Sequence, residues 1–182
     1  MLSEPILVLA RLARIFDALG IRYLVGGSLA SSLYGIPRAT QDVDLVAEVG
    51  LDKVEAITTA LAGEFYVDAE MIRGAIRRSA SFNVIHLATM FKADVFPFRQ
   101  DAWSLEEMAR ARAVRLDAPV GPISIRFASP EDTLLHKLVW YRLGNEVSDR
   151  QWGDILGILR IQGQTLDQDY LAHWGPLLEV ST

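Results

Sequence analysis

The stretch that decides the fold is Gly26-Gly27-Ser28, followed one short helix later by Arg38-Ala39-Thr40-Gln41-Asp42-Val43-Asp44-Leu45. Residues 22–27 form an apolar run that ends in two glycines, which indicates a short strand and a turn. Residues 28–35 are typical of a helix closed by a glycine. Residues 43–49 are rich in β-branched side chains, which favours a strand. This alternation of strands and helices predicts an α/β fold.

Asp42 and Asp44 stand two residues apart on the second of these strands. Because side chains alternate along a strand, both carboxylates point to the same face. Val43 and Leu45 between and beside them indicate a nearby core, where like charges raise each other's pKa and cost stability unless a cation neutralises them. Carboxylate oxygens suit Mg²⁺ or Mn²⁺. The pair therefore predicts a divalent metal site, although the same spacing is also common on solvated edge strands.

Gly26, Gly27 and Ser28 lie where the first strand gives way to a helix. Glycine allows a ligand to approach the backbone closely, and the N–H groups at a helix start attract phosphate. The Ser28 hydroxyl adds a group that can bond a phosphate oxygen. On its own such a segment is more often just a tight turn. Here it precedes a carboxylate pair by one short helix, and the combination predicts a site for a metal-bound triphosphate.

The whole pattern, Gly-Gly-Ser, a short helix, then Arg-x-Thr-x-Asp-x-Asp-Leu, resembles the signature of the DNA polymerase beta-like nucleotidyltransferase superfamily. It is most similar to the Gly-Gly branch, with the abortive-infection type toxins and the antibiotic nucleotidyltransferases. The resemblance implies an α+β core with a mixed sheet flanked by helices. It also implies that Arg38 and Thr40 lie at the nucleotide. A third carboxylate is expected on a later strand, and Asp94 fits because it interrupts the β-type run at residues 91–96.

Hydrophobic periodicity predicts further elements on both sides of this stretch. The expected helices of the first two thirds cover residues 4–19, 51–62 and 104–111. The expected strands cover residues 82–89, 91–98, 112–118 and 123–129, the last two joined by a turn at Gly121-Pro122.

The last third of the chain is predicted to be helical. Capping boxes at residues 129–132 and 148–151 open helices that end near Leu143 and Ile161, and residues 167–178 form a last short helix. No long linker separates this part from the rest. We therefore expect a single domain, residues 1–182, with a core of about 1–128 and a helical tail of about 129–182.

The resemblance extends more loosely into the tail. In related uncharacterised nucleotidyltransferases a helix lysine and a later aspartate lie near the nucleotide, which implies such roles for Lys137 and Asp154. Two structural alternatives stay open. Lys137 can be a solvated helix residue, and Asp154 can pair with Arg150 one turn earlier on the same helix.

Composition limits the remaining function classes. Eighteen Lys and Arg against 23 Asp and Glu give a net charge of −5, which disfavours a protein that grips long nucleic acid duplexes. The chain has no cysteine, so disulfide scaffolds and thiol catalysis are excluded. No apolar run is long enough for a membrane span, and no signal peptide is recognisable, so we expect a cytoplasmic protein. The arginines at residues 73–78 and 110–115 are expected on solvated faces, and the histidines and tryptophans in packing roles.

Taken together, the site predicts a two-metal nucleotidyltransferase that uses Mg²⁺ or Mn²⁺, with Asp42, Asp44 and Asp94 as metal ligands. It would move a nucleoside monophosphate from an NTP to a hydroxyl acceptor, which is a small molecule, a tRNA end or a protein, and release pyrophosphate. Two alternatives share the fold. One is a toxin with the same chemistry and an antitoxin partner, and the other is a non-catalytic nucleotide-binding module. The 51% hydrophobic composition leaves room for a homodimer.

Overall fold

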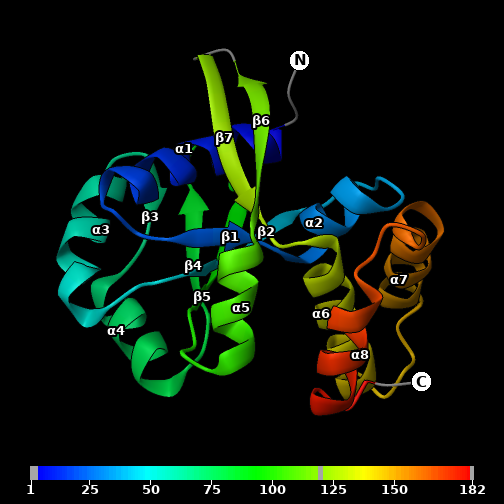
Figure 1. Ribbon diagram of the computed structural model, residues 1–182. Helices are drawn as coiled ribbons and strands as arrows, with labels where there is room; N and C mark the ends of the chain where they lie inside the picture. Colours follow the sequence, from blue (N-terminus) through cyan, green and yellow to red (C-terminus); the bar gives the residue numbers. More distant parts are fainter. Residues whose placement is uncertain (1–3, 119–120, 181–182) are drawn as a thin grey trace.

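A seven-stranded mixed sheet forms the centre of the computed structural model, which describes residues 4–118 and 121–180 (Figure 1). Its order is β3-β4-β5-β2-β1-β7-β6. The pairs β2·β5 and β1·β7 are parallel and the other neighbours antiparallel. The strands are β1 (Tyr23–Val25), β2 (Asp42–Ala47), β3 (Phe65–Tyr66), β4 (Phe82–His86), β5 (Lys92–Pro97), β6 (Arg112–Ala118) and β7 (Gly121–Phe127).

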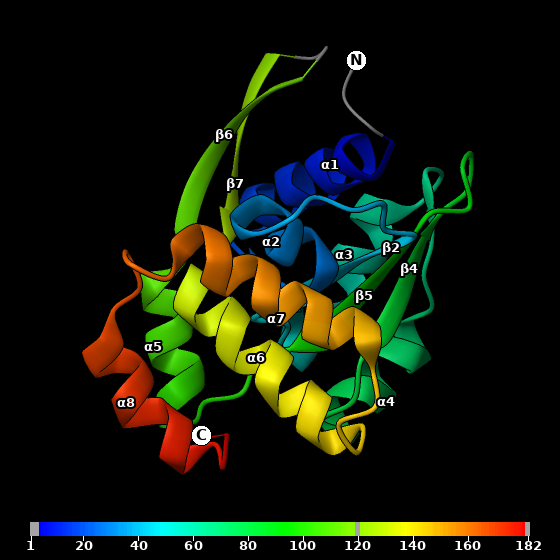
Figure 2. The same cartoon turned by 90° about the vertical axis from the view of Figure 1, so that its right-hand side faces the viewer.

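Helices flank this sheet and form the tail, as the sequence predicted. They are α1 (Glu4–Ala18), α2 (Gly27–Tyr34), α3 (Val54–Leu61), α4 (Ala69–Arg78), α5 (Ala102–Arg110), α6 (Pro130–Leu143), α7 (Asp149–Gln162) and α8 (Gln168–Leu177). In Figures 1 and 2 the helices α6, α7 and α8 stand together on one side of the molecule, and α3 and α4 on the other. The predicted fold class, a mixed sheet with flanking helices and a C-terminal helical tail, is confirmed.

The alternation along β2 fixes which way the predicted acids point. Val43, Leu45 and Ala47 are almost fully buried in the main core, where apolar residues of α1, α3 and α4 meet them. Because successive side chains of a strand point to opposite faces, Asp42 and Asp44 emerge on the other face of the sheet. The burial of the apolar residues therefore orients the carboxylates.

The tail is packed against α2, the helix that follows the two glycines. Tyr34 of α2 shares a buried cluster with residues of α6 and α7, among them Leu134 and Ile158. The backbones approach very closely, because a Cβ placed on Gly35 would lie 2.9 Å from backbone atoms of Gly157 and Ile158. This contact brings the inner sides of α6 and α7 next to the predicted phosphate turn.

The last hairpin corrects one prediction. Gly121 and Pro122 are not the turn but the first residues of β7, where they pair with Ala118 and Asp117. Gly121 has φ of +100°, a conformation that favours glycine. The glycine is therefore needed for its backbone conformation, but at the start of β7 and not in the turn. Residues 119–120 lie outside the described residues. Within the described part, no helix has the length and apolar character to cross a membrane.

Candidate active site

The parallel pairing of β2 with β5 brings the three predicted carboxylates onto one face of the sheet. Asp44 lies directly opposite Asp94, and Asp42 lies directly opposite Lys92. All three acids are partly buried. Burial raises the pKa of Asp44, and the neighbouring charges of Asp42 and Asp94 raise it further. Their carboxylates therefore form a set of hard oxygen donors in which negative charge is poorly tolerated without a cation.

In this structure both oxygens of Asp94 are already engaged. The Lys92 ammonium lies 2.7 Å from Asp94 Oδ2, and the Asn83 side-chain amide donates to Asp94 Oδ1. Among the residues that the structure describes, no three His, Cys, Asp or Glu side chains are grouped so that they could hold a metal ion as they stand. Lys92 thus provides the local positive charge. Sequence reasoning missed it, although a lysine two positions before Asp94 on a strand must share its face.

The predicted phosphate turn lies against Asp44. The Gly26 N–H donates to the Asp44 backbone oxygen at 2.9 Å, and α2 begins at Gly27. Gly27 has φ of +58°, and a Cβ built on it would stand 1.7 Å from Asp44 Oδ2. Glycine is therefore required here for both backbone conformation and space. The first N–H groups of a helix have no intrahelical acceptor, so those of α2 are available beside the carboxylates.

Arg38 connects this turn to the tail. Its guanidinium donates to Ser28 Oγ at 2.6 Å and makes two bonds to the Asp154 carboxylate at 2.8 and 2.9 Å. The Lys137 ammonium lies 2.8 Å from the same carboxylate. Burial alone would raise the pKa of Asp154, but the hydrogen bonds from Arg38 and Lys137 outweigh it and hold that pKa below its ordinary value.

Both structural alternatives for the tail residues are therefore wrong. Lys137 is only 5% exposed, so it is not a solvated helix residue. Asp154 pairs with Arg38 and Lys137, and its bonding partners do not include Arg150. These contacts place Lys137 and Asp154 beside Arg38 and Ser28, close to the acids. The positive charge of Lys137 accordingly lowers the pKa of Asp44, against the larger effects of burial and of the neighbouring carboxylates.

A pocket of about 360 Å³ opens beside these groups. It is lined by Ser28, Arg38, Ala39, Thr40, Gln41, Asp42 and Arg150. Thr40 donates to a carboxylate oxygen of Asp42 at 3.1 Å and thereby helps to hold that side chain. Arg150 is exposed and makes no ion pair within the described part of the chain. Sequence analysis suggested Arg150 only as a partner for Asp154, and its place in the lining of this pocket comes from the structure.

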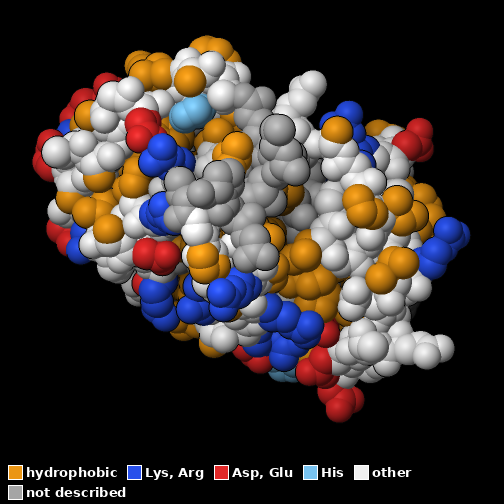
Figure 3. Space-filling view, turned by 90° about the horizontal axis from the view of Figure 1, so that it is seen from above, with side chains coloured by type: hydrophobic (Ala, Val, Ile, Leu, Met, Phe, Trp, Pro, Cys, Tyr) orange, Lys and Arg blue, Asp and Glu red, His pale blue; other side chains and the backbone are white. Residues whose placement is uncertain are grey.

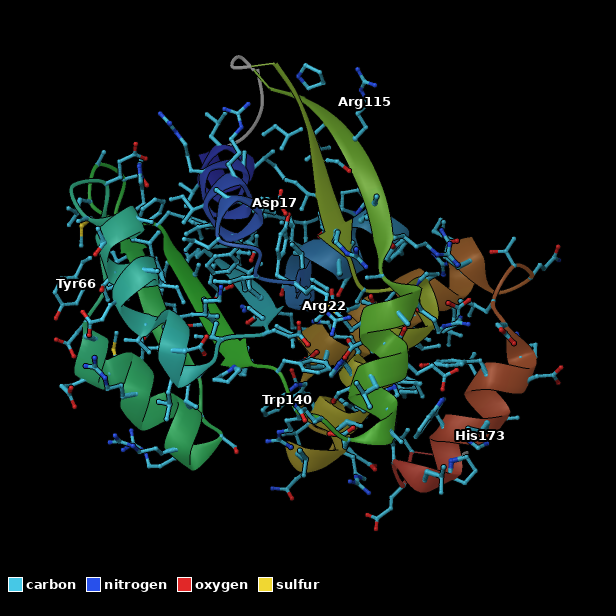
Figure 4. The ribbon with its side chains drawn as sticks, turned by 60° about the vertical axis from the view of Figure 1, so that its left-hand side comes forward. Asp17, Arg22, Tyr66, Arg115, Trp140 and His173 are labelled. Carbon is cyan, nitrogen blue, oxygen red and sulfur yellow. The ribbon has the colours of Figure 1, made fainter. Side chains whose placement is uncertain are left out.

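A smaller hollow of about 210 Å³ lies away from the acids, at the start of β1. Asp17, Arg22, Tyr23 and Arg126 are among its lining residues. Figure 4 shows Asp17 between α1 and the β6–β7 hairpin, and Arg22 below it near the foot of the hairpin. Arg22 is held there by two 2.6 Å bonds to Glu48. Because this hollow contains none of the predicted site residues, the pocket beside Asp42 is the candidate active site.

The other polar candidates have structural roles. His136 bonds Glu107 at 2.8 Å and packs against Trp103, which confirms the packing interpretation for this histidine. Trp103 and Trp174 have the expected packing roles, although they join the tail to α5 and not to the sheet, whereas Trp140 is 54% exposed. The prediction of a solvated face is wrong for Arg110, whose guanidinium lies 3.9 Å above the Tyr170 ring and bonds Glu131.

The sheet order, the carboxylates on adjacent parallel strands and the glycine turn beside them define the class. The protein has the fold of nucleotidyltransferases. No protein-family model matches the chain, and no curated protein sequence matches it either.

Solved structures give the particular likenesses. An antigenic nucleotidyltransferase-like protein from Paracoccidioides brasiliensis has a TM-score of 0.57 and 20% identity, over 96% of this chain and 92% of that one. ANT(2")-Ia in complex with adenylyl-2"-tobramycin has a TM-score of 0.56 and 16% identity, over 98% of both chains. The lincosamide antibiotic adenylyltransferase LnuA, lincomycin-bound, has a TM-score of 0.51 and 13% identity, over 88% of this chain and 98% of that one. At these identities the likeness establishes the fold.

Proposed function

We propose that this protein is a nucleotidyltransferase that moves a nucleoside monophosphate from an NTP to a hydroxyl acceptor and releases pyrophosphate. The observation that carries the proposal is the register of β2 and β5, which sets Asp42, Asp44 and Asp94 on one face beside the glycine turn. A set of like charges in a partly buried position costs stability, so it calls for a functional reason. The nucleotidyltransferase fold supports the same conclusion.

The carboxylates of Asp42 and Asp44, joined by Asp94 once it leaves Lys92, would hold Mg²⁺ or Mn²⁺. Such ions, when bound, neutralise phosphate charge and lower the pKa of a hydroxyl. The close fit of Gly27 against Asp44 supports this assignment, because it keeps the carboxylate next to the N–H groups that would receive phosphate. Thr40 would hold Asp42 in place through its hydroxyl.

The pocket residues would bind the triphosphate. Ser28 and the N–H groups at the start of α2 would meet phosphate oxygens, and Arg150 would add a positive charge that no acid in the described part of the chain neutralises. Asp154 would hold Arg38 and Lys137 at the site, because both cations bond its buried carboxylate. The chain thus presents cations on the pocket side and carboxylates on the sheet side.

In the reaction the acceptor oxygen attacks the α-phosphorus while the bond to the leaving pyrophosphate breaks. Asp94 would take the proton of the acceptor hydroxyl, since its carboxylate lies on the same face as Asp42 and Asp44. Positioning and electrostatic stabilisation supply most of the catalysis in phosphoryl transfer chemistry, which matches a site built mainly from charges.

A small-molecule hydroxyl is the first acceptor class to test. Two of the structural likenesses carry antibiotic names, a lincosamide adenylyltransferase and a complex with adenylyl-2"-tobramycin. The toxin alternative, in which tRNA or a protein is the acceptor and an antitoxin is the partner, uses the same site. The acceptor panel therefore contains aminoglycosides, lincosamides and total tRNA.

The deciding experiment measures pyrophosphate release from each NTP with Mg²⁺ or Mn²⁺ in the presence of this panel. Asp42→Ala/Asp44→Ala is the inactive comparison, and Asp52→Ala, an exposed acid outside the site, is the matched control. Release by the wild type and the control but not by the double variant supports the proposal. Metal-dependent NTP binding without release on any acceptor would favour the non-catalytic module, and absence of NTP binding would refute the proposal.

A further inference from the structure

Helix α7 has two functional faces. Asp154 and Arg150 lie on the side that meets the candidate active site. On the opposite side, Trp152, Leu156 and Leu159 follow one another at the i, i+4, i+7 spacing of a single helical stripe. They are 44%, 46% and 43% exposed. In Figure 2 this helix lies at the front of the molecule, outside α6 and α2.

Two further apolar side chains are exposed on α2 and in the loop after it, across the Asp149–Arg160 flank of α7 from the stripe. Ile36 is 54% exposed and lies beside Gly157 of α7, and Leu33 of α2 is 42% exposed. Figure 3, seen from above, shows hydrophobic side chains on the surface over α2 and the adjoining end of α7. The stripe on α7 itself joins three apolar side chains that are each more than 40% exposed, and such a stripe on a surface helix indicates a contact with another macromolecule.

The charges beside the stripe indicate which partner fits. Asp149 stands at the start of α7 and Arg160 near its end. They are eleven positions apart, about three helical turns, so they lie on the same flank of the stripe. Both are exposed, and neither makes an ion pair within residues 4–118 and 121–180. A helix with an acid at one end and a base at the other, on one flank, is complementary to an antiparallel copy of itself.

We propose that this face binds a second copy of the chain, with the two α7 helices antiparallel about a two-fold axis near Leu156. In that arrangement Trp152 packs on the partner subunit's Leu159, and Leu156 meets the partner's Leu156. Asp149 reaches the partner's Arg160, and the symmetry makes the same pair a second time. The face is therefore self-complementary in charge.

The contact leaves the active site accessible, because Asp154 and Arg150 point to the other side of α7. It is also small. A helix of 14 residues is about 20 Å long, and one face of so short a helix buries less area than the roughly 800 Å² per partner of a standard interface. The dimer is therefore expected to dissociate on dilution.

Sedimentation equilibrium of the full chain over a wide concentration range tests the proposal. The wild type is expected to approach twice its 20.2 kDa mass as concentration rises. Leu156→Arg sets two cations against each other at the axis and is expected to stay at the mass of one chain. Leu105→Arg is the matched control, because Leu105 is a helix leucine of similar exposure, 50%, on α5. It should associate like the wild type.

Charge exchange tests the orientation. Asp149→Arg and Arg160→Asp are each expected to weaken association at least tenfold, and the double variant to restore it. Because the chain has no cysteine, Leu156→Cys introduces a single thiol that should cross-link two copies under oxidation, whereas Leu105→Cys should not. A wild type that remains a single chain, association insensitive to Leu156→Arg, or failure of the double variant to recover would overturn the antiparallel dimer.

Discussion

This protein contains two groups of acids with different surroundings, one partly buried on the sheet and one fully buried in the tail. On the sheet, Asp44 and Asp94 face each other across β2 and β5 with Asp42 beside them, and Lys92 provides the nearest ammonium. In the tail, the carboxylates of Asp132 and Glu131 each accept hydrogen bonds from more than one donor. Burial of an acid therefore does not by itself mark a functional site. What distinguishes the sheet is that like charges share one face.

The carboxylates of the tail acids have hydrogen-bond donors as partners. Asp132 accepts bonds from Ser129, Tyr170 and Trp103. Burial still raises its pKa, although the Ser129 and Tyr170 bonds oppose the rise. Around Asp44 burial also raises the pKa, and the charges of Asp42 and Asp94 are the next largest causes, whereas beside Asp132 the charge of Glu107 has a smaller effect than either hydrogen bond. The tail network builds the fold, whereas the sheet acids hold a charge that a bound cation would relieve.

Removal of one sheet acid is expected to have the largest effect. Asp42→Ala is expected to lower the rate of nucleotide transfer at least about a thousandfold, the scale seen when a group that stabilises the transition state is lost. The fold should persist, because Asp42 is partly exposed and packs no core. Pyrophosphate release and circular dichroism measure the two effects. A variant that keeps wild-type activity would remove Asp42 from the site.

The reverse result is expected in the tail. Asp132→Ala should cost about 3 kcal/mol of folding free energy, because it leaves buried donors without an acceptor. Activity per folded molecule should change little. Urea unfolding gives the stability, and Tyr170→Phe, which removes a single donor, should cost only about 1 kcal/mol. Loss of transfer at unchanged stability would instead place Asp132 in the reaction.

Asp154 lies in the tail, but its carboxylate also bonds Arg38 beside the candidate active site. Asp154→Asn should cost about 2 kcal/mol at neutral pH, because it weakens charged hydrogen bonds to Arg38 and Lys137. The pKa of Asp154 is lowered in the folded state, so its contribution is present above the unfolded pKa and is lost as the pH falls through the folded one.

Denaturant unfolding at neutral and at strongly acidic pH measures this effect. The difference between wild type and Asp154→Asn should close at acidic pH. Asp52→Asn, which changes an exposed acid, should show no comparable difference at either pH. A gap that widens on acidification would contradict the lowered pKa.

The smallest effect runs in the stabilising direction. Asp44→Asn should raise the stability of the metal-free protein by about 0.5–1 kcal/mol, because it removes like charges directly opposite on paired strands. The pKa of Asp44 is raised in the folded state, so its charge costs stability above that pKa. The gain should be full at neutral pH and shrink as the pH falls through the raised pKa. Thermal melts across pH test this, and a melting temperature below that of the wild type at neutral pH would contradict it.

Much of the local structure followed from the sequence because its causes are local. The serine caps at Ser129 and Ser148 start α6 and α7 where the capping boxes predicted them. The alternation along β2 placed Asp42 and Asp44 on one face without any knowledge of the neighbours. The sequence indicated a turn at Gly27, but it could not show that the Cβ of any other residue there would clash with the Asp44 carboxylate.

The partners of charged groups could not be predicted in the same way. Spacing along α7 left Arg150 open as a partner of Asp154, yet Arg38 takes that place because α2 packs on α7. Arg110 looked solvated because nothing in its own segment revealed Tyr170. Both contacts join residues far apart in the chain.

The sequence by itself determined the elements, the carboxylate pair, the glycine turn and the resemblance to nucleotidyltransferases, because helix caps, glycine conformations and strand alternation act over a few residues. Only the tertiary structure decided that Asp94 lies opposite Asp44, that Lys92 and Asn83 hold it there, and that Arg38 joins the turn to the tail. Strand register and helix packing set these contacts, and both arise from burying apolar surface across the whole chain.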